Sequence, residues 1–221
     1  MNEEQLFSKL CHIIDRLLGP GGCPWDQKQT LETLRHSVLE ETCELIDSIE
    51  DKNSQGMTEE LGDLMLNVVF LAKVAAKEGH FTLKDSLEAV TEKLIYRHPH
   101  VFGKGEKIDT VDQLVEQWEE LKKKEKAGQA KKSEMDSIPK SLPSLARAQK
   151  MIKKMSRTKF EIPQNCQELS WDDPALTEEA LGQWLFDAIR QANAKGLDAE
   201  LALRRACTLH EQAFRTWEGI V

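Results

Sequence analysis

The amino-acid sequence predicts an all-α protein. Of its 221 residues, 40% are hydrophobic and 31% are charged, and it has one tyrosine and seven prolines. Runs of β-branched residues are few, whereas apolar residues recur every three or four positions in most segments. This composition and this period are typical of amphipathic helices. The length allows one large domain or two small ones.

The net charge and the cysteines indicate which partners and which cellular compartment to expect. A net charge of −8 argues against a nucleic-acid-binding surface, although metal ions would still allow a polyanionic small substrate. There is no signal peptide and no apolar run of about 18 residues, which argues against membrane insertion. The five cysteines show no CxxC spacing. We therefore expect a reduced, cytoplasmic protein whose cysteines are packing residues.

The first predicted helix runs from Glu4 to Leu18. Its apolar side consists of Leu6, Leu10, Ile13, Ile14 and Leu17. A Gly-Pro-Gly-Gly segment ends the helix, and the loop Cys23-Pro24-Trp25-Asp26 follows. In that loop Trp25 has two possible roles, as a plug in the core, which we favour, or as a surface that stacks on a base.

A first acidic cluster, Glu40-Glu41-x-x-Glu44, lies on the next predicted helix. The apolar stripe of this helix consists of Leu31, Leu34, Val38, Leu45 and Ile49. At about 100° per residue, Glu41 lies at the edge of the stripe and Glu44 about 60° further round. Glu40 points further outward. Taken alone, such a cluster favours a solvated acidic face over a functional site.

A second acidic cluster interrupts a strongly apolar helix, predicted from about Thr58 to Lys77 with Thr58 as its N-cap. Glu60, Asp63 and Asn67 fall in one narrow arc of this helix. A helix this apolar should be buried, and buried carboxylates need a counter-charge. Carboxylates on two neighbouring helices therefore indicate a site for divalent cations. Oxygen-only ligands favour Mg²⁺ or Mn²⁺ over zinc.

The fourth predicted helix, Leu83 to Arg97, carries two cations one turn apart, Lys93 and Arg97. They are either surface cations or ligands for phosphate oxygens. Pro99 separates His98 from His100, and we expect an extended turn in which both histidines are structural rather than a metal-binding pair.

The later part of the chain alternates helices with a charged break. Helices are predicted from Val111 to Lys124, from Leu145 to Met155 and from Ala199 to Trp217, with a mobile charged linker after the first. Residues 179–186 align with residues 59–66 at a shift of 120 positions. In this copy Ala180 and Gln183 replace Glu60 and Asp63, so the second half is predicted to be a degenerate repeat.

These motifs together resemble the MazG-type nucleoside triphosphate pyrophosphohydrolases. The segments that carry the resemblance are Leu17–Asp26, Leu39–Glu44, Glu59–Asp63, Lys93–Gly103 and Ile138–Gln149. The resemblance implies an all-α fold with a four-helix catalytic core that is completed by dimerisation. It also implies Mg²⁺-dependent hydrolysis of nucleoside triphosphates to the monophosphate and pyrophosphate. The expected organisation is a catalytic domain (1–125), a linker (126–141) and a degenerate MazG-like repeat (142–221).

The resemblance also implies the roles of individual residues. The expected metal ligands are Glu41, Glu44, Glu60 and Asp63. Glu40 would support these ligands or act as a base on the attacking water, and Lys93 and Arg97 would hold the triphosphate. The candidates for contact with the base or ribose are Trp25 and Asn67.

Several points stay open at this stage. Because the repeat has lost its carboxylates, a non-catalytic nucleotide- or partner-binding regulator is one alternative. A pyrophosphatase restricted to dUTP or dCTP is another. The two carboxylate-bearing helices offer more apolar surface than one unit of this size can cover. We therefore expect a homodimer, or a higher homo-oligomer, formed through residues 1–102.

Overall fold

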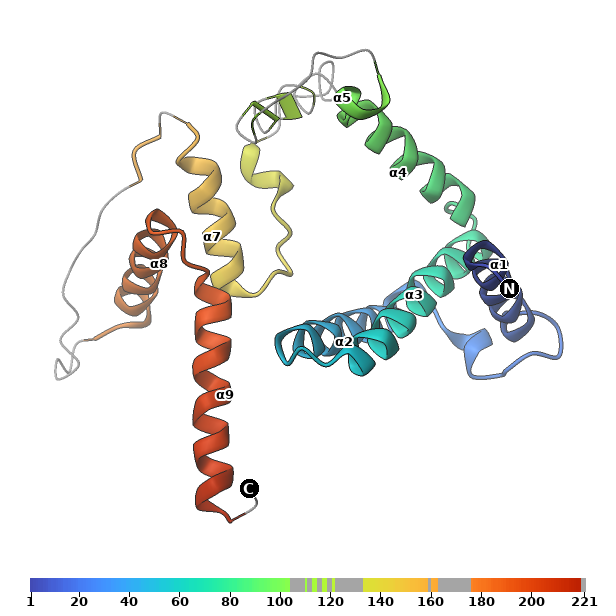
Figure 1. Ribbon diagram of the computed structural model, residues 1–221, viewed down its shortest axis with the longest axis horizontal. Helices are drawn as coiled ribbons and strands as arrows, with labels where there is room; N and C mark the ends of the chain where they lie inside the picture. The colour runs from blue at the N-terminus through green and yellow to red at the C-terminus, as the bar shows by residue number, and fades with distance from the viewer. Residues whose placement is uncertain are drawn as a thin grey trace. The chain divides into compact units, whose positions relative to one another are not determined.

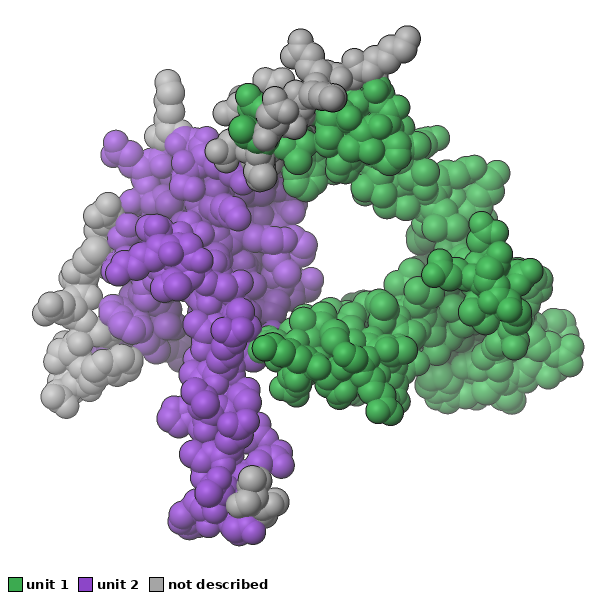
Figure 2. Space-filling model, in the orientation of Figure 1, with its two compact units in different colours: residues 1–127 green, residues 128–221 purple. Residues whose placement is uncertain are grey.

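The computed structural model describes residues 1–103, 110, 113–114, 117–118, 121, 133–158, 160–162 and 176–219. Every regular element in these ranges is helical, which confirms the all-α prediction (Figure 1). The chain divides into two compact units, residues 1–127 and 128–221 (Figure 2). Within the described ranges, no helix has both the length and the apolar character that a membrane span requires.

Unit 1 contains the two acidic clusters. Its α-helices are α1 (Glu3–Leu18), α2 (Leu31–Glu50), α3 (Ser54–Lys77), α4 (Leu83–Arg97) and α5 (Pro99–Phe102), with a short 3₁₀ helix, η1 (Asp26–Lys28), after the glycine-rich loop. Side chains cap the first turns of α1, α2 and α4, through Asn2, Thr30 and Thr82 respectively. The bounds of α4 are those that the sequence predicts.

The start of α3 differs from the prediction. This helix begins at Ser54, and its N-cap is Asn53, whose side chain accepts a hydrogen bond from Gly56 N at 3.1 Å. Thr58 is inside the helix, where its hydroxyl donates to the Ser54 carbonyl at 2.8 Å. Gly56 is usually a sign of a break, but here it permits close approach of α2. A Cβ at this position would lie 2.6 Å from Ser48 Oγ.

The core of unit 1 lies where α1, α2 and the second half of α3 meet. Its buried members are Ile14, Leu34, Val69, Phe70 and Val74. The first half of α3 has an uncovered apolar side, because Leu61, Met65 and Val68 are 51%, 45% and 51% exposed. The expectation that this whole helix is buried is therefore wrong for its first half. No described helix other than α2 covers that half.

Helix α4 is the least covered helix of unit 1. All of its residues from Lys84 to Tyr96 are exposed, and Leu83 is the residue that packs against the core. Its predicted apolar stripe, which includes Leu87 and Leu94, faces solvent. Among the described residues of unit 1, two apolar helix faces thus have no partner within that unit.

The segment after α4 is more compact than predicted. His98 ends α4, and Pro99 starts the short helix α5, so His98 precedes a helical turn and His100 lies within it, where an extended turn was expected. Proline is favoured in the first turn of a helix because the missing N–H would have no partner there. His98 Nδ1 lies 2.7 Å from the carbonyl oxygen of Leu94, which identifies Nδ1 as the donor.

Unit 2 contains η2 (Glu134–Ser137), α7 (Ser144–Met155), α8 (Glu178–Ala194) and α9 (Ala199–Trp217). Gln149 on α7 holds the turn between α8 and α9, because its amide donates to Leu197 O at 2.9 Å and accepts from Ala199 N at 3.3 Å. The shift of 120 residues that relates α3 to α8 also relates Asn67 to Asp187. Both side chains are buried, at 8% and 6% exposure.

Several predicted segments fall wholly or partly outside the described residues. They are most of the Val111–Lys124 helix, the first part of the linker and most of the segment before α8. The described end of the expected linker contains η2, and Ile138 after it is buried at 5% exposure.

Ile13 and Ile14 allow a matched test of the core. Ile14 is fully buried and Ile13 is 47% exposed. We expect Ile14→Ala to lower the stability of unit 1 by about 2–5 kcal/mol, because it removes buried methyl groups and leaves a cavity. Ile13→Ala should cost less than half as much. Native-state hydrogen exchange of the α3 amides reports on unit 1 alone, and equal losses of protection in the two variants would contradict this core.

Candidate metal centre

The candidate site is formed by α2 and α3, which lie side by side as a helical hairpin (Figure 1). The connection is short, and Lys52 within it adopts a left-handed conformation with φ of 55°. Because the hairpin is antiparallel, the middle of α2 faces the first turns of α3. This arrangement places the two acidic clusters of the sequence opposite each other.

Three carboxylates converge in this hairpin. One oxygen each from Glu41 on α2 and from Glu60 and Asp63 on α3 lie within 4.8 Å of one another. All three residues are partly buried. Among the described residues, this is the group of acidic, histidine or cysteine side chains whose geometry suits a metal ion. The convergence that the sequence predicts for Glu41, Glu60 and Asp63 is therefore present.

The proximity of these groups changes their acidity. Burial raises the pKa of Glu41, and the negative charges of Asp63, Glu44 and Glu40 raise it further. The pKa of Glu60 is also raised, first by burial and then by the charges of Glu44, Glu59 and neighbouring carboxylates. Both shifts mean that the folded protein disfavours the ionised forms, first through burial and then through repulsion between the carboxylates. A divalent cation between them would remove this repulsion.

The other two members of the first acidic cluster lie outside this group. Glu40 and Glu44 are both exposed on α2, and neither has an oxygen in the three-residue cluster. The charge of Glu44 nevertheless acts on both Glu41 and Glu60. Its role as a metal ligand stays a prediction. Glu59, whose charge raises the pKa of Glu60, was not among the site residues expected from the sequence. Its position next to Glu60 in the chain was the signal that could have identified it.

Asn67 lies one helical turn beyond Asp63. Its side-chain amide donates to the backbone carbonyl of Asp63 at 3.1 Å, and the residue is 8% exposed. This geometry gives Asn67 a structural contact under the carboxylates. Its contact with a substrate stays a prediction.

The structure does not bring the basic pair to the carboxylates of the same chain. Lys93 and Arg97 lie about 15 and 21 Å beyond Leu83 along α4. Among the described helices, α4 contacts α3 and α5 but not α2, which carries Glu41. A contact between α4 and α2 of the same chain therefore does not bring Lys93 and Arg97 to the carboxylates.

Trp25 also lies away from the cluster. It is 65% exposed and does not plug the core, contrary to the role we favoured. Its loop lies at the last turn of α3, where Lys77 Nζ donates to the Gln27 carbonyl at 3.2 Å. Lys77 and Asp63 are about 21 Å apart along the helix axis. Contact between Trp25 and a nucleotide base stays a prediction.

The donor set at the cluster suits a hard divalent cation. Three carboxylates supply oxygen ligands only, with no thiolate or imidazole among them. Mg²⁺ in proteins is typically held by a few carboxylates and keeps several waters, which leave room for phosphate oxygens. The residues present therefore fit Mg²⁺ or Mn²⁺ better than zinc.

Comparison with known proteins identifies the family. The family model described as the MazG nucleotide pyrophosphohydrolase domain matches residues 29–102, which include both acidic clusters. The chain is 37% identical over 227 residues to the nucleoside triphosphate pyrophosphohydrolase/pyrophosphatase MazG of Thermotoga maritima, covering 98% of this chain and 87% of that protein. It is 36% identical to the nucleoside triphosphate pyrophosphohydrolase of Escherichia coli K12, over 97% of this chain and 88% of the relative.

A solved structure of a mazG-related protein from Thermotoga maritima is also similar. Its sequence identity is 31% and its TM-score is 0.47, with coverage of 52% of this chain and 98% of that chain. The identity and coverage of the full-length relatives determine the assignment. On that basis, with the acidic hairpin inside the matched domain, the chain belongs to the MazG family of nucleotide pyrophosphohydrolases.

Proposed function

We propose that this protein hydrolyses nucleoside triphosphates to the monophosphate and pyrophosphate with Mg²⁺ as its cofactor, Mn²⁺ being able to replace it. The observation that carries the proposal is the convergence of Glu41, Glu60 and Asp63 within 4.8 Å. The names of the relatives from Thermotoga maritima and Escherichia coli support the same reaction. The cellular role would be removal of unwanted nucleotides from the cytoplasmic pool.

The proposed chemistry divides the work among the carboxylates. Glu41, Glu60 and Asp63 would hold the cation, and Glu44 is the fourth proposed ligand. When bound, the cation supplies positive charge to the phosphate oxygens and makes the attacking water more acidic. Glu40, which is exposed on the same helix, would accept a proton from that water. Glu40 would thus take up the proton of the nucleophile, and the cation would offset the negative charge that develops on the leaving pyrophosphate.

The proposal includes a homodimer through residues 1–102. Two uncovered apolar faces support it, one on the first half of α3 and one along α4. On α3, Leu61 and Val68 are each 51% exposed, and on α4, Leu87 and Leu94 are 46% and 49% exposed. Neighbouring exposed apolar residues of this size are typical of an association surface.

Dimerisation would also account for the position of the basic pair. Helix α4 does not pack on its own α2, so Lys93 and Arg97 lie outside the hairpin that carries the carboxylates of the same chain. We infer that Lys93 and Arg97 of one protomer approach the carboxylates of its partner and hold the triphosphate there. This arrangement makes each site depend on two chains.

Metal binding predicts a change in thermal stability. Because Mg²⁺ binds the folded hairpin and relieves its charge repulsion, a concentration ten times the Kd should add about 1.4 kcal/mol of stability. This corresponds to a rise in Tm of about 3–6 °C for a chain of this size. Asp63→Asn should abolish the rise, whereas Glu59→Gln, an exposed neighbour on the same helix, should keep it. Differential scanning fluorimetry measures both, and an unchanged wild-type Tm in millimolar Mg²⁺ would contradict the site.

Hydrolysis is tested with a panel of ribo- and deoxyribonucleoside triphosphates. We expect pyrophosphate release that requires Mg²⁺, and Glu41→Gln should lower it by about a hundredfold or more because a charged ligand is lost. Activity confined to dUTP or dCTP would establish the narrower pyrophosphatase. If the folded protein releases pyrophosphate from none of the nucleotides, the non-catalytic regulator replaces the present proposal.

A mixing experiment tests whether each site uses two chains. Glu41→Gln and Arg97→Ala proteins should each be inactive alone. After exchange of protomers at equal concentration, half of the dimers are mixed, and one of their two sites combines intact carboxylates with an intact α4. About one quarter of wild-type activity should return. A site built from a single chain would give no recovery, and mixing Glu41→Gln with Glu60→Gln protein is the negative control.

A further inference from the structure

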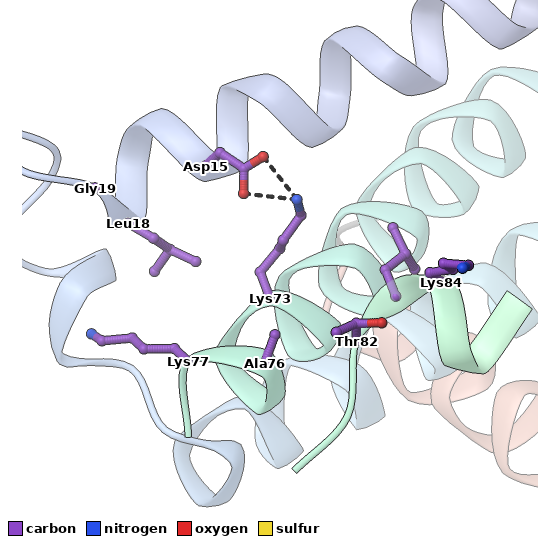
Figure 3. A pocket seen from close by; sticks show the side chains of 9 residues that line it. Asp15, Leu18, Gly19, Lys73, Ala76, Lys77, Thr82 and Lys84 are labelled. Carbon is purple, nitrogen blue, oxygen red and sulfur yellow. Dashed lines mark hydrogen bonds and ion pairs between the residues drawn. The ribbon is translucent and has the colours of Figure 1, made fainter. Parts of the chain in front are cut away.

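Figure 3 shows a pocket of about 530 Å³ in unit 1. It lies at the C-terminal end of α3, whereas Glu60 and Asp63 lie toward the N-terminal end of that helix. It is lined by the end of α1, the last turns of α3 and the start of α4. Lys73, the nearest lining residue of α3, is about 15 Å from Asp63 along the helix axis. The pocket is therefore separate from the carboxylate cluster, and the proposed hydrolysis makes no use of it.

The charge of the pocket is opposite to that of the chain. Its charged lining residues are Lys73, Lys77 and Lys84 and a single acid, Asp15, which leaves an excess of two positive charges. The chain as a whole carries −8. A local positive excess inside a concave surface concentrates anions there, because the surrounding acidic surface repels them.

Two of the lysines are held in place by contacts within unit 1. Lys73 Nζ lies 2.7 and 2.8 Å from the two carboxylate oxygens of Asp15, as Figure 3 shows, and its side chain is 24% exposed. Lys77 Nζ donates to the Gln27 carbonyl at 3.2 Å. Each ammonium group has three N–H donors, so one carbonyl contact leaves Lys77 able to bind a ligand oxygen. The side chain of Lys84 is 79% exposed, with Nζ 3.4 Å from Glu88 Oε1, and its charge also acts on the neighbouring carboxylate of Asp85.

The rest of the lining suits a small molecule with an uncharged part. Leu18, Ala76 and Leu83 supply apolar surface, whereas the hydroxyl of the lining residue Thr82 is engaged with Asp85 in the N-cap of α4. The volume is within the range of small-molecule sites. Lysine ammonium groups beside apolar walls fit a compact phosphate group attached to a less polar body.

We propose that this pocket binds the phosphate groups of a small phosphorylated molecule, independently of the metal centre. Inorganic pyrophosphate and AMP represent the two forms that such a molecule can take, phosphate alone or phosphate with an organic body. The site needs no divalent cation, because its own lysines provide the positive charge.

The test uses the full chain in EDTA, where the carboxylate cluster has no cation and repels phosphate. Isothermal titration calorimetry with pyrophosphate and with AMP should show binding of at least one of them. Lys77→Met and Lys84→Met should each weaken this binding about threefold to fivefold, as expected for partly exposed charge pairs. Asp15→Asn should strengthen it by a similar factor, because the acid that competes for Lys73 is removed.

The gain in Asp15→Asn distinguishes a binding site from a structural contact, since loss of a structural ion pair would not improve affinity. Lys9→Met, at an exposed lysine of α1 outside the pocket, is the matched control and should leave binding unchanged. Glu41→Gln should also leave it unchanged, so this test is independent of hydrolysis. The proposal would be overturned if the wild type bound neither probe at concentrations up to about 10 mM. It would also be overturned if all three pocket variants bound the probe with the same affinity as the wild type.

Discussion

The packing of α2 against α3 forces like charges together, and the rest of unit 1 is arranged around that constraint. Glu41, Glu60 and Asp63 lie within 4.8 Å of one another, and burial together with neighbouring charges raises the pKa of Glu41 and Glu60. A hairpin with these charges is less stable than an apolar one of the same shape. Its stability must come from elsewhere, and the core of α1, α2 and the second half of α3 supplies it.

The same constraint explains the unequal burial of α3. The half that carries the carboxylates stays near the surface, where a cation and a phosphate chain can reach it, and therefore exposes Leu61, Met65 and Val68. The other half contributes the core side of the helix, with Val69 and Val74 each 1% exposed. Site and core are thus two ends of one helix. The exposed apolar residues and the uncovered α4 are what a second copy would cover in the proposed dimer.

Much of the fold and part of the site follow from local sequence. The bounds of α4 and α9 were predictable because clear N-terminal signals and a continuous apolar stripe mark them. The start of α3 was not, since Gly56 is a break signal unless the closeness of α2 is known. The convergence of Glu41, Glu60 and Asp63 followed from their arcs on two adjacent helices. The positions of Lys93, Arg97 and Trp25 did not, because they depend on how whole elements pack rather than on helical periodicity.

The continuity of α3 has a mechanical consequence. The helix is about 36 Å long, and it is clamped in the core at one end while its acidic end is supported mainly by α2. Because the helix is held at one end, a tilt of about 5° there displaces Asp63 by roughly 1–2 Å. Mg²⁺ tolerates little departure from ligand distances of about 2.0–2.1 Å. Repacking around Ile14 and Val74 would therefore change which cation the proposed site prefers without altering any of its proposed ligands.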